Sequence, residues 1–153
     1  MTSADATSIN WAAPATASAE LLIEAPSEVV WSTLVDIESW PAWNPDVESA
    51  EVHGALAEGV AFSWKAGGMS IESRLEDVSS PSRLAWTGTT LGTRAIHVSR
   101  FISVGDQTRA VTEESFEGPL PWLLRVPMRK VLAASLSRGL AALKAESERR
   151  GRD

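Results

Sequence analysis

The sequence contains no cysteine and no tyrosine, and only two of its 153 residues are histidine. The lack of cysteine excludes disulfide bonds, thiolate nucleophiles and cysteine-ligated zinc or iron–sulfur sites. His53 and His97 form no HxxxH or HExxH pattern, so we expect neither a metal nor another cofactor. A Walker loop, Rossmann glycines and a GxSxG motif are also missing, which disfavours nucleotide chemistry and triad hydrolysis.

The chain also lacks a long hydrophobic run. No apolar segment approaches the roughly 18 residues of a membrane-spanning helix, and the N-terminus MTSADATSIN has neither the basic nor the apolar region of a signal peptide. We therefore expect no membrane span and a cytoplasmic location. Fourteen Lys and Arg against twenty Asp and Glu give a net charge of −6, which argues against binding to nucleic acid or to anionic lipid surfaces.

Tryptophan, by contrast, is abundant, with seven Trp beside three Phe. Trp combines the largest apolar area of any side chain with one N–H donor. The length, with 44% hydrophobic and 22% charged residues, predicts one ordinary globular domain. We expect residues 1–15, rich in Ala, Thr and Ser, to form a loose N-terminal extension and residues 16–150 to form that domain.

The first part of the domain predicts one strand and two short helices. Residues 19–24 (AELLIE) are typical of a strand, and Pro26 then suits the first turn of a helix that runs to about Asp36. In residues 37–45 (IESWPAWNP), Trp40 and Asn44 each precede a proline, which disfavours the α conformation at both. This segment therefore predicts a short helical turn followed by a corner.

The middle of the chain predicts an antiparallel meander. Alternating segments are bounded by turn residues, of which Gly67-Gly68 and Gly105-Asp106-Gln107 predict hairpins. Which face of residues 94–104 is buried stays open, because Ile96 and Val98 alternate with His97 and Phe101. The segments predicted as strands are 47–53, 59–65, 69–80, 84–88, 94–104 and 108–117.

The last part of the chain predicts a long amphipathic helix that begins near Pro127. Its apolar stripe is formed by Met128, Val131, Leu132, Leu136, Leu140 and Leu143. The order of elements predicts an α+β domain, in which a curved antiparallel sheet of about seven strands grips this helix. Because sheet and helix cannot close along their whole length, we expect a cleft between them.

Three segments carry a resemblance to a known family. The opening LLIEAPSEVVWSTLVDIESWPAWNPDV, the stretch GDQTRAVTEESFEGPL and the final helix resemble the START/Bet v 1-like (SRPBCC) superfamily in its polyketide cyclase/dehydrase-like branch. The resemblance covers about residues 17–148. It implies a helix-grip fold around a hydrophobic cavity. It implies no particular reaction, because the superfamily includes lipid and hormone binders as well as aromatases and cyclases.

Large apolar side chains on the predicted concave face are candidates for a ligand-binding wall, with plain core packing as the alternative. Trp122 and its neighbours precede the long helix and could instead form a lid or a hydrophobic cap. The predicted ligand-binding residues are Trp40, Trp43, Phe62, Trp64, Ile71, Trp86, Phe101, Trp122, Met128 and Leu132.

Candidate catalytic residues are His97, Glu113 and Glu114. Histidine can change its charge near neutral pH, although the sequence identifies no orienting carboxylate for His97. Adjacent residues of a strand face opposite ways, so one of Glu113 and Glu114 faces the cleft, where burial would raise its pKa. The alternatives are an ordinary strand histidine and glutamates paired with arginines across the hairpin.

These observations favour a binding protein that holds a hydrophobic or aromatic small molecule, lipid-like or polyketide-like, between the sheet and the final helix. One alternative is a cyclase, aromatase or dehydratase that uses the same cavity. A second alternative is a protein-interaction module. We expect a monomer or a homodimer.

Overall fold

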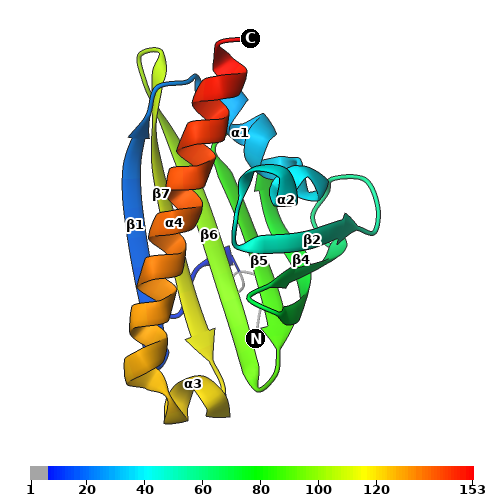
Figure 1. Ribbon diagram of the computed structural model, residues 1–153, viewed down its shortest axis with the longest axis vertical. Helices are drawn as coiled ribbons and strands as arrows, with labels where there is room; N and C mark the ends of the chain where they lie inside the picture. Colours follow the sequence, from blue (N-terminus) through cyan, green and yellow to red (C-terminus); the bar gives the residue numbers. More distant parts are fainter. Residues whose placement is uncertain (1–6) are drawn as a thin grey trace.

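The computed structural model describes residues 7–153 and confirms the predicted α+β helix-grip fold. The first strand is followed by a helix and then by two shorter helical elements. Six strands come next, and a short helix then precedes the long C-terminal helix (Figure 1). The elements are β1 (Ala15–Ile23), α1 (Ser27–Val35), η2 (Ile37–Ser39), α2 (Trp40–Trp43), β2 (Val47–Val52), β3 (Ala61–Ala66), β4 (Met69–Ser79), β5 (Arg83–Thr90), β6 (Thr93–Val104), β7 (Gln107–Glu117), α3 (Pro119–Leu123) and α4 (Arg125–Gly151).

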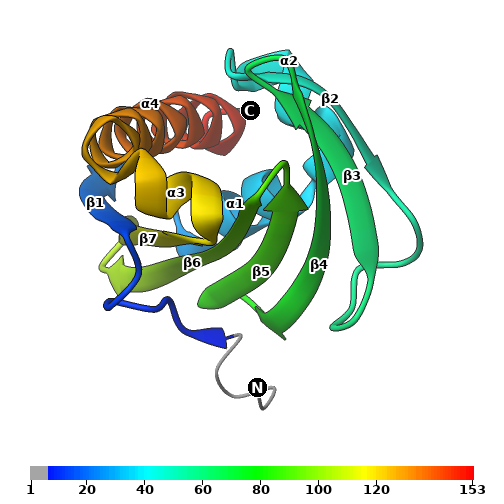
Figure 2. The ribbon, with the colours of Figure 1, turned by 90° about the horizontal axis from the view of Figure 1, so that it is seen from below.

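The seven strands form one antiparallel sheet in the order β1-β7-β6-β5-β4-β3-β2. The chain runs as a meander from β2 to β7, and β1 pairs with β7, so the first and last strands in the sequence are neighbours. The sheet curves around one side of α4, as the view along the helix shows (Figure 2). The curvature gives the sheet a concave face toward α4 and a convex face away from it.

Helix α4 packs on the concave face through a stripe of leucines, and chiefly against β1. Leu132, Leu136, Leu140 and Leu143 are buried at the helical spacing that the sequence predicts. Val131 departs from that stripe and is 63% exposed, because it lies on the side of α4 that faces away from the sheet. Within residues 7–153 no helix is both long and apolar enough to cross a bilayer.

Both faces of β6 are covered, which explains why the pattern alone could not orient this strand. Ile96 and Val98 are buried on the convex face in a cluster with Ile9 and Ala85. The segment that carries Ile9 is tied to the sheet by Asn10, whose backbone N–H donates to Ser115 Oγ at 3.1 Å. The alternation along β6 therefore directs its other side chains, including His97 and Phe101, to the concave face.

The corner after α1 differs in one respect from the prediction. Trp40 adopts the α conformation (φ −50°, ψ −43°) although Pro41 follows it, whereas Asn44 is extended as predicted (φ −103°, ψ 110°). The Trp40 indole N–H donates to the Leu34 carbonyl oxygen at 2.9 Å, and only 3% of the residue is exposed. Burial and this hydrogen bond offset the steric penalty that a following proline imposes.

Candidate functional site

His97 occupies the concave face of the sheet between Trp86 and Glu114. In the register of the sheet, Trp86 on β5 is directly opposite His97 on β6, and His97 is directly opposite Glu114 on β7. The three side chains therefore form a row on one face. The imidazole stacks on the Trp86 indole, with ring centroids 4.2 Å apart and the planes 5° from parallel.

Both ring nitrogens of His97 have polar neighbours. Nε2 lies 2.9 Å from Thr112 Oγ1 and 3.4 Å from Ser99 Oγ, and Nδ1 lies 3.5 Å from Glu114 Oε1. A carboxylate beside Nδ1 favours the proton on that nitrogen, which leaves Nε2 to accept a hydrogen bond from the Thr112 hydroxyl. We call His97, Ser99, Thr112 and Glu114 the polar floor.

The polar floor separates two apolar clusters that pack under α4. Ala110, two residues before Thr112 on β7, belongs to the cluster that contains Leu140 and Leu143. Phe116, two residues after Glu114, packs against the cluster that contains Leu132 and Leu136. The polar floor therefore lies between these two clusters on the concave face.

The two titratable side chains of the polar floor are not fully buried. The side chains of His97 and Glu114 keep 15% and 16% of their accessible surface, so there is space beside them. Among the described residues, Glu114 has no ion-pair partner other than His97. A carboxylate has several acceptor positions, so Glu114 can accept a hydrogen bond from a ligand that donates one.

Beside the polar floor, four aromatic rings form a compact cluster around Trp40. The Trp40 ring centroid lies 5.7 Å from that of Phe62, 5.4 Å from that of Trp64 and 5.4 Å from that of Trp86. Trp64 also donates from Nε1 to Ser73 Oγ at 3.0 Å. Trp40 and Phe62 fill the centre of the core, while Trp64 is only partly buried and Trp86 presents a ring face to His97.

Other residues predicted for the ligand wall also lie on the inner side of the molecule. Phe101 is buried in the core cluster, Leu132 is buried on α4, and Ile71 and Met128 are partly buried. Trp43 packs against the same core, and its buried Nε1 has no hydrogen-bond partner among the described residues.

Two predicted site residues lie away from this face. Glu113 points to the convex side, where its Oε1 is 3.2 Å from Arg100 Nη2, so of the two adjacent glutamates only Glu114 faces inward. Trp122 lies on α3 and is 61% exposed, and the Arg125 guanidinium carbon is 5.2 Å from its ring centroid. Neither residue is brought together with His97.

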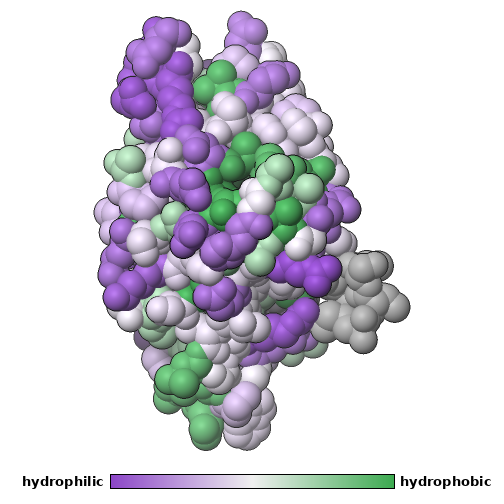
Figure 3. All heavy atoms as spheres, turned by 90° about the vertical axis from the view of Figure 1, so that its right-hand side faces the viewer, coloured by the Kyte–Doolittle hydropathy of each residue, from purple (hydrophilic) through white to green (hydrophobic). Residues whose placement is uncertain are grey.

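Two surface hollows lie outside the interface between sheet and α4. One, of about 360 Å³, is on the outer side of β2, β3 and β4 and includes Ser49, Ser63 and Glu72. The other, of about 270 Å³, includes Ile37, Val52 and Leu56 and lies on the face that carries the β2–β3 loop, where Figure 3 shows a hydrophobic patch at mid-height. Neither hollow is lined by His97 or Glu114, but the first is also lined by Trp64, one of the predicted ligand-binding residues.

The sequence analysis did not identify the hydroxyl partners of His97. Ser99 is two residues after His97 on β6, and Thr112 is two residues before Glu114 on β7. Residues two apart on a strand share a face, so the spacing carried the signal. The pairing of β6 with β7, which sets Ser99 opposite Thr112, was the missing information.

Comparisons with known proteins agree with this architecture. Residues 14–148 match the model of the family described as polyketide cyclase / dehydrase and lipid transport. A search of curated proteins found no significant match.

Three solved structures illustrate the likeness of fold. A hypothetical protein from Helicobacter pylori has 20% identity and a TM-score of 0.78, covering 92% of this chain and 96% of that one. The Zhui aromatase/cyclase from Streptomyces sp. R1128 has 19% identity and a TM-score of 0.76, covering 88% and 94%. A START superfamily protein from Mycobacterium smegmatis has 15% identity and a TM-score of 0.74, covering 88% and 97%.

Proposed function

We propose that this chain, which belongs to the polyketide cyclase / dehydrase and lipid transport family, binds a hydrophobic or aromatic small molecule. The ligand would lie between the sheet and α4. The observation that carries the proposal is the polar floor, which sets a histidine and a carboxylate on an otherwise apolar face. Polar groups on such a face are costly unless they are paired or have a function.

The chemistry of the polar floor indicates what kind of ligand it suits. A phenol or alcohol group can donate to Glu114, while the apolar body of the ligand contacts Trp86, Ile71 and the leucines of α4. We therefore favour a flat molecule with a hydroxyl group at one end.

Binding can be tested with hydroxylated naphthalenes and anthraquinones and with fatty acids, by tryptophan quenching and by the shift in melting temperature. We expect saturable binding of a hydroxylated aromatic compound that Glu114→Gln weakens about tenfold, because the neutral amide oxygen of Gln accepts a weaker hydrogen bond than a carboxylate does. Glu113→Gln is the matched control, because it changes the adjacent residue on the convex face and should leave the affinity unchanged. Equal effects of the two substitutions, or no saturable ligand, would contradict the proposal.

A second candidate function is an enzyme of the cyclase, aromatase or dehydratase type. The 3.5 Å approach of Glu114 to His97 favours it, because this pair can hold and move a proton. In a cyclisation, Glu114 would take a proton from a carbon beside a carbonyl, and that carbon would form a bond to a second carbonyl carbon. The resulting alkoxide would take a proton from the His97–Glu114 pair, which restores its starting state. Loss of the new hydroxyl group and a neighbouring hydrogen as water, followed by enolisation, would then make the ring aromatic.

The enzyme can be separated from the binding protein with a linear polyketone thioester as substrate. An enzyme is expected to produce a cyclic product with aromatic absorbance, and Glu114→Gln to slow its formation by 100-fold or more, about the contribution of a general base. If the product formed equally fast with and without protein, the protein would not be an enzyme for this reaction, and binding would be the only proposed function left.

A further inference from the structure

One end of the molecule carries large apolar side chains that the fold leaves in solvent. They lie on α3, at the start of α4 and in the turn between β5 and β6, all at the lower end in Figure 1. A hydrophobic patch is also visible at the lower end of the space-filling view (Figure 3). We call this surface the α3 pole, formed by Leu91 (81% exposed), Trp122 (61%), Leu123 (70%), Leu124 (46%) and Val126 (60%).

The α3 pole is held in a defined position. Gly118, which precedes α3, lies so close to the β5–β6 turn that a Cβ atom there would be 2.5 Å from the Gly92 carbonyl oxygen. The backbone N–H of Leu120 donates to the same oxygen at 3.4 Å. Leu91 adjoins Gly92 in the sequence, so the turn and α3 present their apolar side chains together. Exposed apolar residues gathered in this way mark an interaction surface.

The charge around the α3 pole is opposite to that of the whole chain. Residues 118–145 contain five of the fourteen Lys and Arg and none of the twenty Asp and Glu, so the rest of the protein carries the acidic excess. Within residues 7–153, Arg125, Arg129 and Lys130 form no ion pair with a carboxylate. The net charge of −6 argued against binding to anionic surfaces. That value is a sum over the whole chain, however, and does not show that one end of the protein is basic.

Tryptophan and leucine beside arginine and lysine that have no carboxylate partner are the combination that inserts into the interface of an anionic membrane. The Trp122 ring beneath the Arg125 guanidinium suits the boundary between headgroups and acyl chains, where an aromatic ring is buried and a cation meets phosphate. We propose that the α3 pole docks the protein on an anionic lipid bilayer. The proposal does not depend on the ligand of the polar floor.

The test is sedimentation of the full-length protein with vesicles of phosphatidylcholine alone and with vesicles that contain about one third phosphatidylglycerol. We expect binding to the anionic vesicles only, with an affinity that falls as NaCl rises. The variant R125Q/K130Q should bind about 25-fold more weakly, since each cation near an anionic surface contributes about fivefold. L123A/V126A should also weaken binding, and both variants should keep the wild-type melting temperature because these side chains are exposed.

Matched controls come from other exposed surfaces. Leu56→Ala removes an apolar side chain that is 41% exposed in the β2–β3 loop, and Arg74→Gln removes an exposed cation on β4. Neither substitution should alter vesicle binding. Equal binding to both vesicle types, equal loss in the controls, or no binding to either vesicle would overturn the proposal. A different outcome is that the protein binds no vesicles but self-associates, as measured by light scattering, in a way that L123A/V126A abolishes. The α3 pole would then be a contact between two copies of the chain.

Discussion

His97 lies flat against Trp86, with 4.2 Å between the ring centroids. This contact joins the polar floor to the aromatic cluster, because the Trp86 ring centroid is also 5.4 Å from that of Trp40 and 6.0 Å from that of Phe62. Trp86 is therefore both a core residue and the edge of the candidate site.

The double position of Trp86 predicts a large effect on stability. Trp86→Leu should lower the free energy of unfolding by about 3 kcal/mol, since it leaves space beside the rings of Trp40 and Phe62 and removes the stack on His97. Urea denaturation followed by far-UV circular dichroism measures this loss. Trp122→Leu, at an exposed position, should change the same quantity by less than about 0.5 kcal/mol. Comparable losses would show that the aromatic cluster is not packed as described.

The hydrogen bond of Trp40 predicts a second stability effect. Trp40→Phe keeps an aromatic ring but leaves the Leu34 carbonyl oxygen without its donor, and it should lower the free energy of unfolding by about 2 kcal/mol. Trp11→Phe, at a residue that is 60% exposed, is the control and should have almost no effect. If Trp40→Phe were as harmless, the hydrogen bond and the burial of Trp40 would not stabilise the corner.

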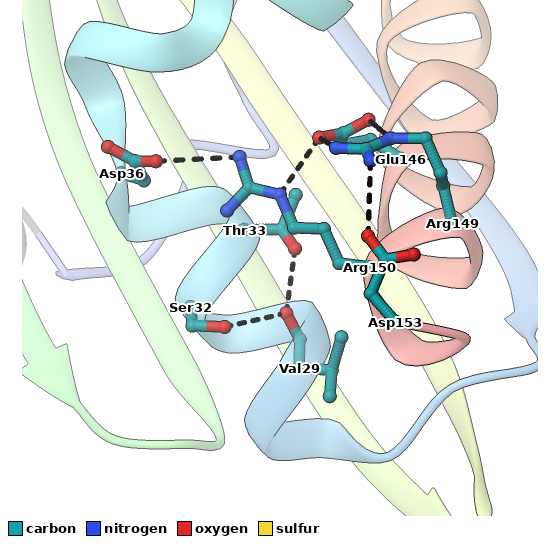
Figure 4. A network of polar contacts seen from close by, with 8 residues as sticks. All are labelled: Val29, Ser32, Thr33, Asp36, Glu146, Arg149, Arg150 and Asp153. Carbon is teal, nitrogen blue, oxygen red and sulfur yellow. Dashed lines mark hydrogen bonds and ion pairs between the residues drawn. The ribbon is translucent and has the colours of Figure 1, made fainter.

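The C-terminal end of α4 predicts how stability depends on pH. Hydrogen bonds from Arg149 and then Arg150 lower the pKa of Glu146 from 4.5 to about 2 (Figure 4). Because the folded pKa is the lower one, the ionised carboxylate stabilises the fold above pH 4.5, and that contribution is lost as the pH falls from 4.5 toward 2.

Glu146→Gln should therefore be less stable than the wild type at pH 7, by about 1 kcal/mol after screening by solvent, and the difference should shrink toward zero near pH 2. Urea denaturation across this pH range measures it. Replacing both arginines in R149M/R150M should remove the same pH dependence. A difference that stays constant with pH would be at odds with the lowered pKa.

The contact between Gly118 and Gly92 predicts that replacing Gly118 by alanine costs more stability than the same substitution at Gly67. Gly118 has φ +119° and no room for a Cβ, so Gly118→Ala should lower the free energy of unfolding by about 3 kcal/mol. Gly67 also has positive φ, at +57°, but it faces open space, and Gly67→Ala should cost only about 1 kcal/mol. Thermal denaturation of the two variants compares them, and equal costs would mean that α3 is not held against the β5–β6 turn.

Much of the fold was predictable because local signals agreed with one another. Helix starts and turns were predicted close to their observed bounds. The signals were Pro26, the two prolines on either side of Trp43 and the Gly67-Gly68 turn. The family resemblance is confirmed by the match over residues 14–148, and solved structures share the fold. The alternation of Ile96, His97 and Val98 could not orient β6, because apolar side chains occur on both of its faces and Ile9 covers the convex one.

The site was predictable only in part, because it depends on pairing between strands. The sequence identified His97 and the two glutamates, but only the register sets Glu114 opposite His97 and Thr112 opposite Ser99. Val131 shows a similar limit, since helical spacing places it beside the stripe while the width of the interface leaves it exposed. The roles of the predicted ligand-binding and catalytic residues stay predictions.

The scarcity of histidine allows a direct test of binding at the polar floor. With 15N-labelled histidine, the protein gives imidazole signals from His97 and His53 alone, and His53 lies in the outer layer where its Nε2 is 2.8 Å from Ser63 Oγ. Titration with a hydroxylated naphthalene, followed by NMR, should shift the His97 signals saturably and leave those of His53 in place. Unchanged His97 signals with a bound ligand, or equal shifts at both histidines, would contradict the account.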